Sequence, residues 1–131
     1  MRRTLSRILL APTVQTLSYR CAIALFLSIV IVGALPGARE EVGKYASGVV
    51  LHSLAYAILA TLLFLGSNGD RTERAVKSVL TIVVMGAGDE YVQSFVPYRT
   101  ASVADWMIDV IAGSVASALS WHRWPKLAEA G

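Results

Sequence analysis

The chain has 131 residues, of which 55% are hydrophobic and 16% are charged, and its mean hydropathy is +0.57. A soluble domain carries about 25% charged residues, so this composition favours one small membrane domain. The formal net charge of +3 comes from basic residues that flank apolar runs, a pattern that sets membrane orientation and argues against a nucleic-acid-binding protein. The single cysteine, Cys21, excludes an intrachain disulfide and argues against a cysteine-based metal site.

The first uncharged runs predict two membrane-spanning helices. Residues 21–38 form a run of 18 residues without a charge, and residues 45–69 form a run of 25, interrupted only by His52. A helix rises about 1.5 Å per residue and needs about 20 residues to cross the hydrocarbon core. We therefore predict helices at about 19–36 and 46–66.

The second half predicts two further spans whose ends carry acids. Residues 78–88 give only 11 uncharged residues and residues 110–122 only 13, which is too short to cross. Helices at about 76–96 and 103–122 would each have about 20 residues. The alternative is a re-entrant pair that enters the membrane from one side.

The helix ends and the basic residues predict the topology. Pro97 ends the third predicted helix and Ser102 is the N-cap of the fourth. The N-terminus, the loop between the second and third helices and the C-terminus hold 9 Lys and Arg, whereas the other loops hold 3. The positive-inside rule places both termini in the cytoplasm. The expected fold is an all-α integral membrane four-helix bundle in a single domain, 1–131.

The N-terminal segment has two further interpretations. Residues 2–9 alternate basic and apolar side chains, which is typical either of a short interfacial helix on anionic lipid or of a frayed tail. A cleaved signal peptide is the alternative for the first span. Pro36 and the lack of a small-x-small cleavage site favour a retained helix.

Polar side chains gather near the outer ends of three predicted helices. His52, Glu90 and Asp109 each lie about six residues from such an end, hence at roughly the same depth of 9 Å. Charged groups in hydrocarbon face the interior and find partners, and by default they mark function. We therefore predict one ligand-binding site made of eight residues: Asp89, Glu90, Gln93, Arg99, Asp105, Asp109, His52 and Tyr56.

Catalysis at this site would use Glu90, His52 or Asp109, with Glu90 or His52 as general base. Arg99 is placed to bind a carboxylate through two parallel hydrogen bonds, or a phosphate. A metal site of His52, Glu90 and Asp109 is chemically feasible. No short metal-ligand motif supports it, so we expect neither a metal nor a cofactor.

Five site residues have structural alternatives, and two of them, Gln93 and Arg99, are also explained as purely structural partners. Asp89 is expected in headgroup water at the membrane surface, and Asp105, at the N3 position, also stabilises a helix dipole. His52 is equally well explained as a hydrogen-bonded core histidine.

Small residues recur every fourth position along the last helix, at Ala112, Ala116 and Ser120 and at Gly113 and Ser117. Such a stripe lets helices approach closely. It predicts packing within the chain or between copies in a homo-oligomer.

The polar pattern resembles a known family. The string Asp89-Glu90-x2-Gln93-x-Phe95-x-Pro97-x-Arg99, followed by Asp105-x3-Asp109-x3-Gly113, resembles the VanZ-like family, as does His52-x3-Tyr56 with Leu59. The similarity covers about residues 49–119. The family usually has Asn in place of Asp109 and often Lys in place of Val49. Asn keeps hydrogen-bond acceptance but does no acid–base work.

The resemblance implies a small multi-pass protein of the bacterial plasma (inner) membrane. The family's namesake is associated with resistance to teicoplanin, a lipid-bearing glycopeptide antibiotic. We expect an acidic site facing the outer leaflet that binds or handles a cell-envelope lipid or lipid-linked glycan, with membrane lipids as partners and no nucleic acid. A membrane-embedded enzyme acting on such a lipid, a proton-coupled transporter and a purely structural membrane partner stay open as alternatives.

Overall fold

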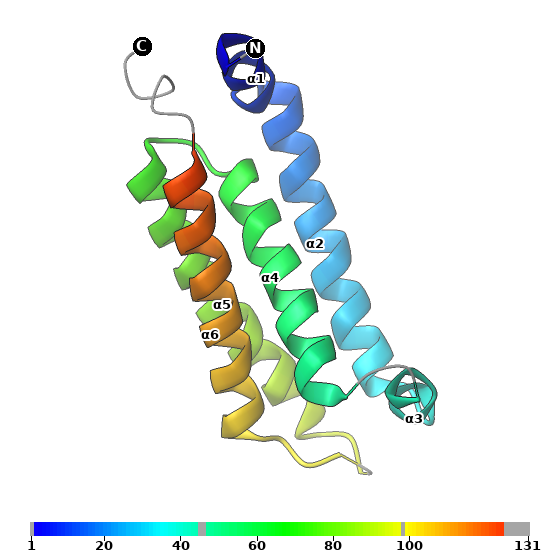
Figure 1. The fold of residues 1–131 in the computed structure, drawn as a ribbon. Coiled ribbons are helices and arrows are strands. Elements are labelled where there is room, and N and C mark those ends of the chain that lie inside the picture. The colour runs from blue at the N-terminus through cyan, green and yellow to red at the C-terminus, as the bar shows by residue number, and fades with distance from the viewer. Residues whose placement is uncertain (1, 45–46, 98, 125–131) are drawn as a thin grey trace.

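The computed structural model describes residues 2–44, 47–97 and 99–124, and in these ranges it contains helices and no strand. The all-α prediction is therefore confirmed. Figure 1 shows the long helices α2, α4, α5 and α6 side by side, with α1 and the end of α6 together at one end, here called the α1 end, and α3 at the opposite end, the α3 end. The elements are α1 (Arg2–Leu9), α2 (Pro12–Ala34), α3 (Ala38–Gly43), α4 (Gly48–Gly66), α5 (Arg71–Gln93) and α6 (Val103–Arg123).

Helix α4 is the centre of the packing. It contacts α2 on one side and both α5 and α6 on the other, while α5 and α6 also contact each other. The buried apolar residues that join these helices come from α2, α4 and α5: Ala22, Tyr56, Leu59, Ala60, Leu63 and Ile82. Because α4 has neighbours on both sides, any polar group on its inner faces meets another helix.

The distribution of polarity is the reverse of that in a soluble protein. Exposed positions on the long helices carry large apolar side chains, including Leu17, Ile31, Leu54, Ile58, Leu80, Val84, Ile111 and Val115. Buried positions carry polar ones, including Arg74, Ser78, Asp89, Glu90, Gln93, Asp109 and Ser117. Helices α2, α4 and α6 are long and apolar enough to cross a membrane, and α5 does not meet the same hydropathy criterion. These features indicate a membrane protein.

Small residues on α6 let it pack closely on α5. A Cβ added to Gly113 would lie 2.8 Å from Ile82 Cγ2. One turn further, Ser117 donates to Ser78 Oγ at 2.9 Å, and Ser78 donates to the Ala60 carbonyl of α4 at 2.8 Å. Part of the small-residue stripe thus serves packing within the chain, and a homo-oligomer stays a prediction.

Two helix starts differ from those predicted by hydropathy. Helix α5 begins at Arg71, not near 76, because Asp70 caps it: Asp70 Oδ1 accepts from the Thr72 and Glu73 amides, and Glu73 Oε2 accepts from the Asp70 amide. Helix α2 begins at Pro12, not near 19, with proline in its first turn. Both extensions are polar turns that an apolar window misses.

The ends of α5 and α6 at the α3 end show one correction and one agreement. Helix α5 ends at Gln93 rather than Val96, because the Phe95 and Val96 amides bond to carbonyls three residues back. The chain therefore leaves the helix before Pro97. Ser102 is the N-cap of α6, as predicted, and its Oγ accepts from the Asp105 amide at 3.3 Å.

Only one of the two short helices lies in a segment for which a helix was predicted. Helix α1 covers the segment 2–9, and its placement on lipid stays a prediction. Helix α3 was not predicted; its first turn carries Glu40 and Glu41, where acids favour the helix dipole.

Replacing Asp70 with alanine is expected to lower the free energy of unfolding by about 1 kcal/mol, because two amides of the first α5 turn lose their acceptor. Glu40→Ala, which removes an exposed acid that caps nothing in the structure, is the matched control. Detergent-denaturant titration of both variants, followed by circular dichroism, measures the difference. Equal stability of the two variants would contradict the capping role.

Candidate functional site

The first part of the site is a histidine–aspartate pair between α4 and α6. His52 Nδ1 lies 2.9 Å from Asp109 Oδ1. The Asp109 side chain is fully buried, whereas His52 keeps 18% of its side-chain surface exposed. Because a carboxylate only accepts, Nδ1 carries the proton and the other ring nitrogen is left for another partner.

The second part is a chain of hydrogen bonds from α4 to α2 through α5. Tyr56 donates to Asp89 Oδ2 at 3.3 Å, and Gln93 Nε2 donates to Asp89 Oδ1 at 2.9 Å. Arg99 donates to Gln93 Oε1 through Nη2 and to the Gly33 carbonyl through Nη1, the latter at 2.8 Å. Gln93 thus connects Asp89 with Arg99, and the direct pair between Arg99 and a carboxylate stays a prediction.

Glu90 connects the end of α5 to the start of α6. Its Oε2 accepts from the Ser102 amide at 2.7 Å, so a carboxylate sits beside the N-terminus of α6, where negative charge is favoured. Its other oxygen, Oε1, is buried and has no hydrogen-bond partner in the structure, and the same holds for Asp109 Oδ2.

Three carboxylates meet where α4, α5 and α6 come together. Asp89, Glu90 and Asp109 each offer one oxygen, and these oxygens all lie within 4.8 Å of one another. Asp89 and Glu90 are adjacent in sequence, yet both are buried, because α4 and α6 cover two sides of α5. The expectation that Asp89 sits in headgroup water is therefore wrong.

A cavity of about 220 Å³ lies between α2 and α4, beside this network. Three polar side chains line it: His52, Tyr56 and Arg99. Its remaining walls are apolar or glycine: Ile29, Val32, Gly33, Gly48, Leu51 and Ala55.

The sequence was compared with family models, curated proteins and solved structures. The model of the family described as VanZ/LLP1 matches residues 5–124, which is nearly the whole chain. The chain belongs to the VanZ/LLP1 family. The resemblance carried by the acids and by His52 and Tyr56 is thus confirmed at the level of family. No curated protein and no solved structure matches.

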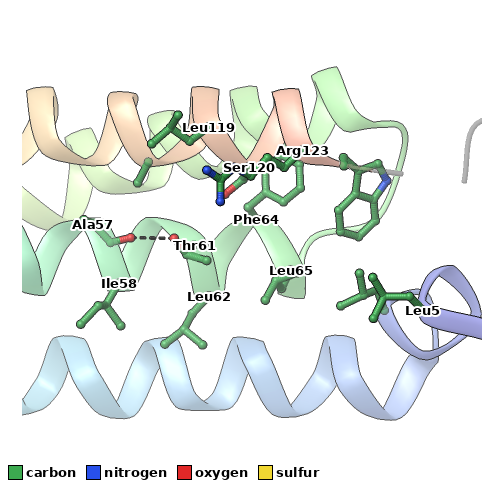
Figure 2. A pocket seen from close by; sticks show the side chains of 13 residues that line it. Leu5, Ala57, Ile58, Thr61, Leu62, Phe64, Leu65, Leu119, Ser120 and Arg123 are labelled. Carbon is green, nitrogen blue, oxygen red and sulfur yellow. Dashed lines mark hydrogen bonds between the residues drawn. The ribbon is translucent and has the colours of Figure 1, made fainter. Parts of the chain in front are cut away.

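The VanZ/LLP1 chain also has a larger groove, of about 640 Å³, at the α1 end (Figure 2). Its walls are apolar apart from Thr61, Ser120 and Arg123. The Thr61 hydroxyl is already bonded to the Ala57 carbonyl of its own helix at 2.9 Å. Polar groups do not converge there as they do at the α3 end, so the smaller cavity is the better candidate site.

Seven of the eight predicted site residues join the network of this VanZ/LLP1 chain, and Asp105 does not. Asp105 is half-buried in the first turn of α6, and its backbone amide bonds to Ser102. It lies outside the group of three carboxylates. Its role in ligand binding, like that of the other seven, stays a prediction.

Two hydrogen-bond partners of the site side chains are backbone groups, and the sequence did not predict them. They are the Gly33 carbonyl, which accepts from Arg99, and the Ser102 amide, which donates to Glu90. A backbone group leaves no residue-type signal. Ser102 was predicted only as the N-cap of a helix. Gly33 lies in an uncharged run that predicts a membrane-spanning helix and nothing more.

Proposed function

We propose that this VanZ/LLP1 protein crosses the bacterial plasma membrane four times and binds the polar headgroup of a cell-envelope lipid or lipid-linked glycan between α2 and α4. The observation that supports this proposal is the cavity between α2 and α4, which combines apolar walls with His52, Tyr56 and Arg99. Sites with mostly apolar walls and a few convergent polar groups are typical of small-molecule binding. A molecule with a polar head and an apolar chain matches both parts.

The exposed face of α5 supports a fourth span. Val76, Leu80, Val84 and Tyr91 are each at least half exposed, and their spacings of four, four and seven residues put them on one side of the helix. Asp89 and Glu90 of α5 lie on the buried side, whereas Glu73 is exposed in the first turn of the helix. Part of the low hydropathy of α5 thus comes from residues that would not meet lipid, and its 23 residues would extend about 34 Å.

The distribution of basic residues supports the orientation. In the part of the chain that the structure describes, the segments at the α1 end hold 8 Lys and Arg residues and those at the α3 end hold 3, so the positive-inside rule would put the α1 end in the cytoplasm. The cavity and the acids would then face the outer leaflet, where envelope precursors with lipid anchors are displayed.

The three polar side chains that line the cavity suggest how a headgroup would be held. Arg99 offers a planar, permanently charged donor group suited to phosphate. His52, oriented by Asp109, would present its second ring nitrogen as an acceptor for a hydroxyl. Tyr56, bonded to Asp89, would add contact area and keep its place in the network.

The pair of His52 and Asp109 favours one second candidate, an enzyme that acts on the same lipid. A histidine held by a carboxylate is a general arrangement for removing a proton from a hydroxyl or water. Under this alternative, His52 would be the general base and Asp109 its positioning residue.

Native mass spectrometry of the protein purified from its own membranes tests the binding proposal. The wild-type chain is expected to retain a lipid class that His52→Ala loses at least tenfold, because His52 lines the cavity. Ser120→Ala, in the apolar groove at the opposite end, is the control and should retain the lipid. An identical lipid profile for all three proteins would sink the proposal.

The enzyme alternative has a separate readout. Envelope lipids are compared by mass spectrometry in cells that lack the protein or carry wild type, Glu90→Gln or His52→Asn at matched levels. A lipid species that wild type creates, and that His52→Asn fails to create while still binding its precursor, would support catalysis. Unchanged lipid chemistry in every strain would leave binding alone.

A further inference from the structure

We propose that Asp89, Glu90 and Asp109 bind one divalent metal ion of the oxygen-liganded class, such as Ca²⁺, Mn²⁺ or Mg²⁺, where α4, α5 and α6 meet. This site lies behind the cavity and does not depend on the lipid proposed to bind there. It also differs from the combination of His52, Glu90 and Asp109 that was considered and set aside in the sequence analysis. In the structure His52 bonds to Asp109, and Asp89 is the third member of the group.

The spacing of the three carboxylates suits such an ion. One oxygen from each residue lies within 4.8 Å of the others. Calcium binds oxygen at about 2.3–2.6 Å, so two ligands on opposite sides of the ion are about 5 Å apart. Magnesium, at about 2.0–2.1 Å, needs a tighter group. A group of oxygens within this limit is compatible with Ca²⁺, and the smaller ions would need a closer approach of the three carboxylates.

Two unpartnered oxygens provide an independent indication of a ligand. Glu90 Oε1 and Asp109 Oδ2 are buried and without a hydrogen bond, and their residues are only 8% and 0% exposed. The remaining oxygen of each is already engaged, by the Ser102 amide and by His52 respectively. Buried polar atoms are nearly always satisfied, and a cation bound by the carboxylates of Glu90 and Asp109 would provide a partner for them.

The surrounding groups hold the carboxylates without neutralising them fully. Asp89 accepts from the neutral Tyr56 hydroxyl and the neutral Gln93 amide. Asp109 pairs with His52, whose single charge at most offsets one of three acids. A divalent ion would balance the other two. The chemical rival is protonation of two carboxyl groups, and it is the competing outcome of the test.

Metal binding is measured on the purified full-length chain, without added lipid, after removal of metals by a chelator. Ca²⁺ and Mn²⁺ are added separately, and bound metal is counted by elemental analysis, with Mn²⁺ also followed by electron paramagnetic resonance. We expect about one ion per wild-type chain and at least tenfold weaker binding by Glu90→Gln and Asp109→Asn. Glu40→Gln, which removes one charge from an exposed acid on α3, should bind as wild type does.

Terbium provides a second readout on the wild-type chain alone. Tyr56 is bonded to Asp89, and Trp106 lies one turn from Asp109 on α6. Excitation of these rings should therefore sensitise the emission of bound Tb³⁺, and added Ca²⁺ should displace the Tb³⁺ and reduce that emission.

Circular dichroism confirms that each variant is folded. If Asp109→Asn does not fold, the test rests on Glu90→Gln. Folded wild type that binds no ion above a protein-free detergent control would overturn the site in favour of protonated acids. Equal losses in Glu40→Gln and Glu90→Gln would overturn it in favour of diffuse attraction. Because no lipid is added and the bound metal is counted directly, either failure leaves the lipid-binding proposal to its own experiment.

Discussion

Replacing Arg74 with alanine is expected to lower the free energy of unfolding by about 3 kcal/mol, since a charged donor with several buried acceptors is lost. Arg74 stands in the first turn of α5 and is only 1% exposed. Its Nη1 donates to the Phe64 and Leu65 carbonyls at 3.3 Å each, and its Nε donates to the Gly69 carbonyl at 2.9 Å.

These acceptors explain why a buried arginine is tolerated. The last carbonyls of a helix have no partner within it, and positive charge is favoured at that end. Arg74 thus closes the C-terminal end of α4 from the neighbouring helix, with its guanidinium 4.8 Å from the centre of the Trp124 ring. Alanine would leave the Phe64 and Leu65 carbonyls without this donor.

Arg71→Ala is the matched control, because it removes the same charge three residues earlier. Arg71 is half-buried and lies 4.2 Å over the Trp121 ring, a contact worth about 1 kcal/mol or less at such a site. Arg74→Lys keeps the charge but not the fork of donors, so its loss should fall between the two. Denaturant titration of the four proteins by circular dichroism gives the values. If Arg71→Ala and Arg74→Ala cost the same, Arg74 has no special part in ending α4.

The sequence predicts the elements well where hydropathy and capping agree. Ser102 marks the start of α6 in both prediction and structure. At α5 the two signals conflict, because the capping box of Asp70 and Glu73 lies in a charged turn that an apolar window rejects. The cap is the better guide, since it satisfies helix amides whatever the solvent around them.

The sequence predicted which residues come together in the candidate site better than it predicted which of them bond to each other. Equal depth along three helices was enough to bring His52, Glu90 and Asp109 to one region, and the structure places them there. Which residues bond to which depends on helix rotation and on backbone groups. Asp89 was expected in headgroup water at the membrane surface, and the structure buries it. Its burial follows from α4 and α6 packing on two sides of α5, a tertiary fact that local spacing does not contain.

Replacing Gly113 with leucine is expected to lower the free energy of unfolding by about 3 kcal/mol, the upper range for overpacking a core. Even a Cβ at this position would lie 2.8 Å from Cγ2 and 3.1 Å from Cγ1 of Ile82. Ile82 is fully buried and β-branched, so it has little freedom to turn away. The helices must separate instead, which also stretches the bond between Ser117 and Ser78.

Ala112→Leu separates this effect from a general intolerance of bulk on α6. Ala112 is adjacent in sequence but lines an open groove, so leucine there should change the free energy of unfolding by less than about 1 kcal/mol. A double-mutant cycle that combines Gly113→Ala with Ile82→Ala adds a direct test, because the effects of mutations at contacting residues are not additive. The penalty of Gly113→Ala should shrink when Ile82 is already alanine. An unchanged penalty would show that α5 and α6 do not meet at these residues.

The particle mass of Ala112→Leu in detergent, measured by light scattering, gives a separate result. A change in mass for this variant alone would indicate that the small residues beside Ala112 form a contact between copies of the chain.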